Sequence, residues 1–185
     1  MLPGQPEKRE HSYHRLGTIN LIANFNVVTG QIVAPTTARR TEEDFVNHIA
    51  QTVANDPVGS WIFVVDQLNT HKSASLVGFI AQQEGIDEAT LGKKGKSGIL
   101  KSMETRKAFL SNETHRIRFI YTPKHTSWLN QVEIWFSILV RKLLKRGSFK
   151  SIADLKARIL GFIDYFNRTM AKQEKWTFKG RPLSA

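Results

Sequence analysis

Apolar and polar residues alternate with a period of two in the early part of the chain, a pattern typical of β-strands. The alternation is clearest over residues 18–26. The turn residues Val28-Thr29-Gly30 follow it, and Gln31-Ile32-Val33 returns to an extended pattern. These residues therefore predict a β-hairpin.

Helical and extended patterns follow one another along the rest of the chain. Thr41 precedes three acidic residues, which is typical of a helix N-terminus. Phe45, Ile49 and Val53 then recur at helical spacing and predict a helix to about Asn55. The run Trp61–Val65 is continuously apolar, which favours a strand buried on both faces, as in a parallel sheet. The other expected elements are a helix over 73–81, a helical piece over 99–110, a strand over 117–121, a long helix capped by Ser127 that runs to about Lys145, and a helix after Ser151.

Residues 82–112 differ in composition, because Gly, Lys and Glu are frequent there. We interpret this segment as an insertion between core elements. The order of hairpin, helix, strand, helix, strand and two helices predicts an α/β fold with a mixed sheet flanked by helices. We expect one domain over residues 1–170 and a basic tail over residues 171–185.

Charge narrows the range of partners. The 185 residues include 27 Lys and Arg against 16 Asp and Glu, a net charge of +11. This excess favours a polyanionic partner, with nucleic acid preferred over an anionic membrane surface or a ribosome. Without cysteine the chain has no disulfide and no thiolate metal site. No stretch approaches the ~20 apolar residues of a membrane span and no signal peptide is visible, so we expect a soluble cytoplasmic protein.

Two acidic residues are candidates for a catalytic metal site. Asp66 directly follows the apolar strand, and ligands of open α/β sheets bind beyond the carboxyl ends of the strands. Glu133 lies at the edge of the apolar arc of the long helix. Carboxylates are ligands that Mg²⁺ prefers, and Mn²⁺ can substitute for it. Two ions roughly 3.5–4 Å apart would activate a water or a 3′-hydroxyl group. With the basic charge, Asp66 and Glu133 predict a site for polynucleotidyl transfer.

Each acid also has a simpler interpretation. Asp66 would cap the following turn, and Glu133 would be a solvated residue at the rim of a helix. A site of this kind normally has a third carboxylate, and the sequence offers no good candidate. Asp44 lies in an expected helix and Asp56 in a loop.

Other polar and basic residues are expected to support the metal site or to bind DNA. Those that would support the metal site are Asn69, His71, His125 and Asn130, although a lone histidine is more often structural. Those that would contact DNA phosphates are Lys93, Lys94, Lys96, Lys124, Arg141, Lys142, Lys145 and Arg146. A solvated loop and favourable charges at a helix C-terminus are the alternatives for the basic residues. Gly95-Lys96-Ser97 does not predict a phosphate-binding loop, because Thr90 stands where that motif needs glycine.

Residues 66–72 and 121–133 resemble the second and third acidic motifs of transposases of the mariner superfamily, and in particular the bacterial insertion sequence 630 family. Residues 11–18 and Trp176-Thr177-Phe178 are also similar to that branch. The resemblance implies a ribonuclease-H-like fold and a DDE mechanism, with Asp66 as the second acid and Glu133 as the third. Such an enzyme hydrolyses a DNA strand and then joins the freed 3′-hydroxyl to target DNA.

The sequence departs from this family pattern in two respects. The family's first Asp lies on a strand before the hairpin, and the chain begins near that junction. We therefore expect the first central strand, its Asp and the upstream helix-turn-helix domain to be missing. The isolated chain would then be poorly stable or inactive. Asp66 and Glu133 are also further apart than in compact members, which the insertion at 82–112 explains.

The expected partners are transposon-end and target DNA, an upstream transposase fragment and a second copy of the chain. Two rival functions remain. A non-catalytic DNA-binding remnant would keep the basic surface and lack the chemistry. A structural nucleic-acid chaperone would rest on charge alone.

Overall fold

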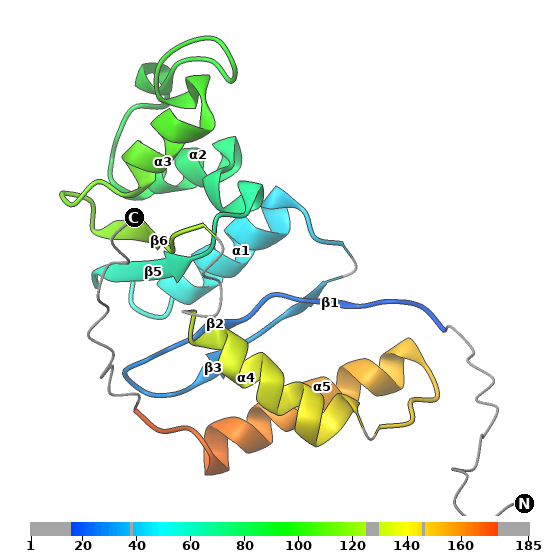
Figure 1. Cartoon of the computed structure of the whole chain (residues 1–185). Helices are drawn as coiled ribbons and strands as arrows, with labels where there is room; N and C mark the ends of the chain where they lie inside the picture. The colour runs from blue at the N-terminus through cyan, green and yellow to red at the C-terminus, as the bar shows by residue number, and fades with distance from the viewer. Residues whose placement is uncertain (1–15, 38, 125–129, 146, 174–185) are drawn as a thin grey trace, which may run out of the picture.

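The computed structural model describes residues 16–37, 39–124, 130–145 and 147–173. Figure 1 shows the elements in an upper and a lower group. The upper group comprises α1 (Glu42–Val53), β5 (Trp61–Val65), η1 (Asn69–Lys72), α2 (Ala74–Gln83), η2 (Glu88–Leu91), η3 (Ile99–Lys101), α3 (Met103–Leu110) and β6 (Ile117–Tyr121). The lower group comprises β1 (Asn20–Leu21), β2 (Asn24–Phe25), β3 (Ile32–Val33), β4 (Thr36–Thr37), α4 (Val132–Leu139), η5 (Val140–Leu144) and α5 (Ile152–Thr169).

Two apolar cores correspond to these groups. The first core contains buried residues of α1, β5, α2, α3 and β6, among them Ile49, Leu76 and Phe119. The second core contains residues of β3, α4 and α5, among them Trp135 and Ile163. Burial of these side chains is the main force that holds each group together.

The predicted hairpin is confirmed, and its return strand continues further than the pattern indicated. β1 pairs with β4 and β2 pairs with β3, both antiparallel. The hairpin separates the two cores, because successive side chains point to opposite faces. Leu21 and Phe25 pack against the second core, whereas Ile22 packs against the first. Asn24 Nδ2 also donates a hydrogen bond of 2.7 Å to Thr52 Oγ1 on α1.

Helix α1 has the N-terminus that the sequence predicted. Thr41 Oγ1 accepts a hydrogen bond from Asp44 N at 3.1 Å, and Asp44 Oδ2 accepts one from Thr41 N at 2.9 Å. This reciprocal pair satisfies two backbone donors that the helix itself leaves unpaired. Ser73 and Ser151 cap α2 and α5 with a single bond each, because their hydroxyl oxygens accept from Leu76 N and Asp154 N.

The strands expected at 61–65 and 117–121 are confirmed as the parallel pair β5 and β6. The prediction that β5 is buried on both faces is wrong. Ile62 is 53% exposed and Val64 is 49% exposed, whereas Phe63 packs against the first core. The upper helices pack against only one face of the pair, and in the described part of the chain nothing buries the other.

The expected single mixed sheet does not form among the described residues, whose strands make three separate two-stranded sheets. Within those residues β6 is the only strand that pairs with β5, and the hairpin strands pair with each other. The fold is therefore α/β with small sheets flanked by helices.

The long helix begins later than expected. Ser127, its predicted cap, lies outside the described residues, and α4 begins at Val132. Asn130 and Gln131 form a bend and a turn before it. The helix continues as the π-helical segment η5 to Leu144, close to the predicted end. Glu133 consequently lies in the first turn of α4.

The segment 82–112 packs onto the first core. Its residues Leu91 and Leu110 are buried there. Gly92 and Gly98 have φ angles of 84° and 65°, and a Cβ atom on either would collide with backbone atoms across the turn that joins them. This close approach requires glycine at both positions. No described helix is long and apolar enough to cross a membrane.

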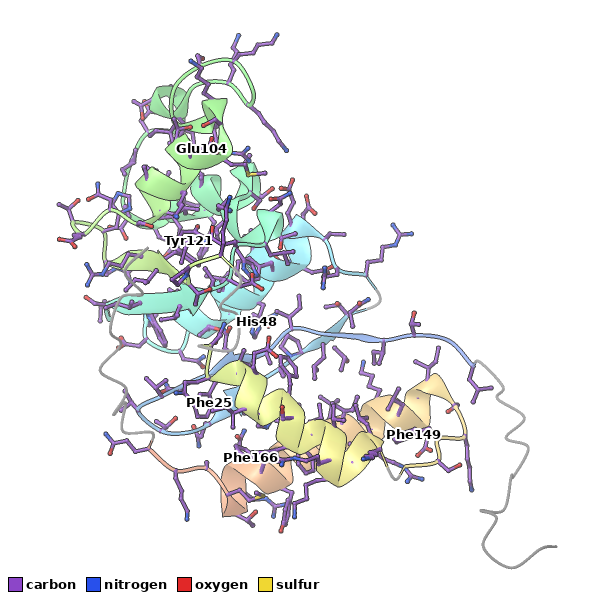
Figure 2. All side chains as sticks on the ribbon, viewed as in Figure 1. Phe25, His48, Glu104, Tyr121, Phe149 and Phe166 are labelled. Atoms are coloured by element: carbon purple, nitrogen blue, oxygen red, sulfur yellow. The ribbon has the colours of Figure 1, made fainter. Side chains whose placement is uncertain are left out.

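His48 is a buried polar residue on α1. It is 1% exposed, and neither ring nitrogen has a hydrogen-bond partner among the described residues. It lies one turn before Thr52, so it occupies the face of α1 that meets the hairpin. Figure 2 shows His48 between α1 and the hairpin. Burial lowers the pKa of His48 from 6.5 to about 4.

His48 should make the protein sensitive to acid. The unfolded chain protonates this ring below pH 6.5 and the folded chain does so only near pH 4. Stability is therefore intact above 6.5 and falls as the pH drops, by about 1.4 kcal/mol per pH unit for one proton. We expect His48→Leu to remove this part of the slope in urea unfolding between pH 6.5 and 4. Equal slopes in both proteins would contradict the assignment.

Candidate active site

The carboxyl ends of β5 and β6 meet at one edge of the parallel pair. Val65 is aligned with Tyr121, and Thr122 N donates a hydrogen bond of 2.9 Å to Val65 O. Gln67 Nε2 donates to Thr122 O. These bonds join the loops that follow the two strands. Ligands of open α/β sheets bind at this edge, beyond the carboxyl ends of the strands.

Asp66 lies at this edge with one of its carboxylate oxygens engaged. Oδ1 accepts hydrogen bonds from Leu68 N at 2.9 Å and from His71 Nδ1 at 2.9 Å. The other oxygen, Oδ2, makes no hydrogen bond within the described residues, and the side chain is 42% exposed. Asp66 therefore caps the following turn and also offers an oxygen to a ligand, so its two interpretations are compatible.

His71 holds the Asp66 carboxylate in place. Its ring lies 4.4 Å from the ring of Phe45, and its backbone oxygen accepts a hydrogen bond of 2.7 Å from Tyr121 Oη. Burial lowers the pKa of His71 below 6.5, although the nearby Asp66 charge opposes the shift. The ring is thus neutral at pH 7. Nδ1 faces two oxygens of Asp66, so we assign the proton to Nδ1.

Glu133 differs from Asp66, because no described side chain orients its carboxylate. Its side chain is exposed, and among the described residues its carboxylate makes no hydrogen bond or ion pair. The start of α4 is organised by Asn130, whose Oδ1 accepts from Val132 N at 3.4 Å and whose backbone oxygen accepts from Glu133 N at 3.0 Å. Asn130 therefore supports the helix turn that carries Glu133.

The donor chemistry suits Mg²⁺, since the free atoms are carboxylate oxygens. The ligand set is incomplete, because the described residues contain no group of three His, Asp or Glu side chains able to hold a metal ion. The structure brings His71 to Asp66 and Asn130 to Glu133. Of the other expected supporting residues, Asn69 is exposed in η1, and His125 lies outside the described residues.

The predicted DNA-binding residues form two separate basic surfaces. Lys93, Lys94 and Lys96 are exposed on the glycine turn of the insertion, where Lys94 Nζ lies 3.6 Å from Glu42 Oε1. Arg141, Lys142 and Lys145 are exposed at the end of the α4–η5 helix. In Figure 1 the insertion is at the top of the molecule and α4 is in the lower half. Lys124 is exposed after β6, and Arg146 lies outside the described residues.

Sequence reasoning missed Tyr121 as a site residue. Its hydroxyl joins the end of β6 to η1, and Lys72 and Lys107 lie over its ring. The available signal was its place as the last residue of the strand expected over 117–121, in the same sheet as the Asp66 strand. The register that aligns it with Val65 is not visible in the sequence.

The fold and site define an α/β domain with a half-exposed carboxylate at the end of a parallel strand. A family model described as DDE superfamily endonuclease matches residues 1–156. The chain belongs to this superfamily, and its domain is therefore of the transposase-type nuclease class. Comparison with curated proteins and with solved structures found no match.

The Tyr121 hydroxyl should stabilise the site loop. Tyr121→Phe removes the hydrogen bond to His71 O and keeps the ring, so we expect the free energy of unfolding to fall by about 1 kcal/mol. Tyr165→Phe is the matched control, because Tyr165 is 51% exposed on α5. Denaturant unfolding of both variants measures the effect. A loss of equal size in both would show that the Tyr121 bond is unimportant.

Proposed function

We propose that this chain is the catalytic part of a transposase of the mariner superfamily, from the insertion sequence 630 family. It cleaves a DNA strand and joins the freed 3′-hydroxyl to target DNA in the cytoplasm. The proposal rests on one observation: in a chain of the DDE superfamily, the Asp66 carboxylate is held in one orientation and keeps one oxygen unbonded among the described residues. His71 and the Leu68 amide orient the carboxylate and leave Oδ2 available.

Asp66 and Glu133 would hold Mg²⁺, or Mn²⁺ in its place. The bound metal supplies activation of the attacking oxygen and stabilisation of the leaving oxygen. The protein's own contribution is to fix its ligands. Neutral His71 keeps Asp66 in one orientation, and Asn130 organises the turn before Glu133. Such support typically changes metal affinity or activity about 10–100-fold.

We further propose that a strand from outside the described residues completes the sheet and carries the third acid. Parallel sheets are normally buried on both faces, yet Ile62, Val64 and Ile120 are each about half exposed. Within the described residues β5 also lacks a strand on its second edge, which leaves its backbone groups available for pairing. The unpaired ring nitrogens of His48, on the α1 face that meets the hairpin, are a further sign of an incomplete interior.

The sources that we propose for this strand are an upstream transposase fragment and a second copy of the chain. We favour the upstream fragment, because a third acid is needed and the described residues of this chain hold no third ligand. A shift to the dimer mass in light scattering, with cleavage by the chain alone, would favour the second copy.

DNA would contact both basic surfaces. We propose that Lys93, Lys94 and Lys96 bind one segment of transposon-end or target DNA and that Arg141, Lys142, Lys145 and Arg146 bind another. Lys124, which is exposed after β6, would contact a further phosphate. Exposed ammonium and guanidinium groups bind phosphates without reading sequence. Because the insertion and the α4–η5 helix lie in different halves of the molecule, one DNA substrate would contact both surfaces if it passed across the edge of the β5–β6 pair that carries Asp66.

A non-catalytic DNA-binding remnant is the second candidate function. The incomplete acidic set among the described residues favours it. It keeps the same basic surfaces and predicts DNA binding without cleavage.

Metal-dependent nicking of DNA tests these functions. The assay compares this chain with a chain extended upstream to include the proposed strand, each with Mg²⁺ or Mn²⁺. We expect nicking by the extended chain and a loss of at least about a hundredfold in Asp66→Ala and in Glu133→Ala, since each removes a metal ligand. Asp164→Ala, an exposed acid paired with Arg168 on α5, should keep full activity.

The remaining outcomes separate the candidates. DNA binding without metal-dependent cleavage in either form would favour the remnant. Cleavage that survives Asp66→Ala would exclude the proposed site.

A further inference from the structure

Two lysines lie over the ring of Tyr121. Lys72 Nζ is 5.8 Å from the ring centroid and Lys107 Nζ is 5.3 Å from it. Lys72 is the last residue of η1, directly after the Asp66 loop, and Lys107 lies on α3 in the insertion. α3 and η1 pack together, so the insertion brings a second positive charge to the edge of the parallel pair.

Neither lysine is neutralised within the described part of the chain. Lys72 Nζ donates one hydrogen bond, of 3.2 Å, to Gln67 Oε1, and Lys107 Nζ makes no hydrogen bond. Neither forms an ion pair there. The nearby Glu104 is exposed on the first turn of α3 (Figure 2), and its pKa is lowered first by a hydrogen bond with Ser102 and less strongly by the charge of Lys72, with which it forms no ion pair among the described residues. An ammonium group has three donors, so most of this capacity is free.

A short chain of contacts connects the two lysines to the Asp66 loop. Tyr121, whose ring carries both lysines, donates to His71 O, and His71 Nδ1 lies 2.9 Å from Asp66 Oδ1. Lys72 follows His71 in the chain and is bonded to Gln67, the residue after Asp66. Both lysines are partly buried and are connected to Asp66 through Tyr121, His71 and Gln67.

Two like charges over one ring repel each other, and the ring face offsets this cost only in part. A bound anion would remove the repulsion and use the free donors. Phosphodiester oxygens are accepted by ammonium groups, and they are the anions that a DNA strand offers.

We propose that Lys72 and Lys107 bind a phosphodiester group of the DNA strand that reaches Asp66. The identity of the ligand rests on the proposed function. The insertion then forms a wall of the site, because its helix α3 supplies Lys107. Tyr121 is a positioning residue for both lysines.

The salt dependence of DNA binding tests this site. The dissociation constant of the full chain for a short DNA duplex with a single-stranded overhang is measured over a range of KCl concentrations, without divalent metal. The logarithm of this dissociation constant rises linearly with the logarithm of the KCl concentration, and the slope reports the number of phosphates that the protein neutralises. We expect Lys72→Met and Lys107→Met each to lower it by roughly one, and the double variant by roughly two.

Control variants separate this effect from folding and from general charge. Lys72→Arg and Lys107→Arg keep the charge and should keep the slope. Lys156→Met removes an exposed lysine on α5 and should leave the slope unchanged. Thermal melting checks that each variant is folded. An unchanged slope in the folded Met double variant would overturn the proposal, as would a wild-type chain that does not bind DNA.

Methylphosphonate substitution locates the contact and keeps the two proposals distinct. Neutralising one phosphate near the end of the strand should weaken binding by the wild type and have no effect on the double variant. The same sensitivity in both proteins would overturn the lysine site even if the extended chain cleaves DNA. Loss of that sensitivity in the double variant would support the site even if no form of the chain cleaves.

Discussion

The parallel pairing of β5 with β6 is the interaction on which the candidate site depends. Its register sets Tyr121 beside Val65, so that the two following loops leave the sheet at one edge. The bond from Tyr121 Oη to His71 O then fastens η1, and His71 in turn orients Asp66. Without the register, Asp66 would be a turn cap with no neighbours from the second strand.

The described residues stabilise the pair from one side only. The first core packs α1, α2 and α3 against the face that carries Phe63 and Phe119, while Ile62 and Val64 on the opposite face are about half exposed. The hairpin belongs to both cores, with Ile22 on one and Phe25 on the other. Among the described residues, the two halves of the fold are thus linked by side-chain packing and by the bond between Asn24 and Thr52, and no continuous sheet joins them.

The insertion contributes to the core and to the site. Leu91 and Leu110 are buried in the first core, and the same helix that buries Leu110 carries Lys107 to Tyr121. Gly92 and Gly98 allow the lysine-bearing turn between η2 and η3 to close tightly. The segment that its composition indicated to be an insertion therefore contributes buried side chains to the first core and a lysine to the site.

The sequence by itself determined what depends on neighbouring residues: the cap and start of α1 at Thr41, the strands at 61–65 and 117–121, and the position of Asp66 at a strand end. These follow from periodicity and side-chain-to-backbone bonds within a few residues. Tertiary structure decided which face of β5 is covered, where α4 begins and which lysines reach Tyr121. Those features depend on strand register and on packing between distant segments, which no local pattern encodes.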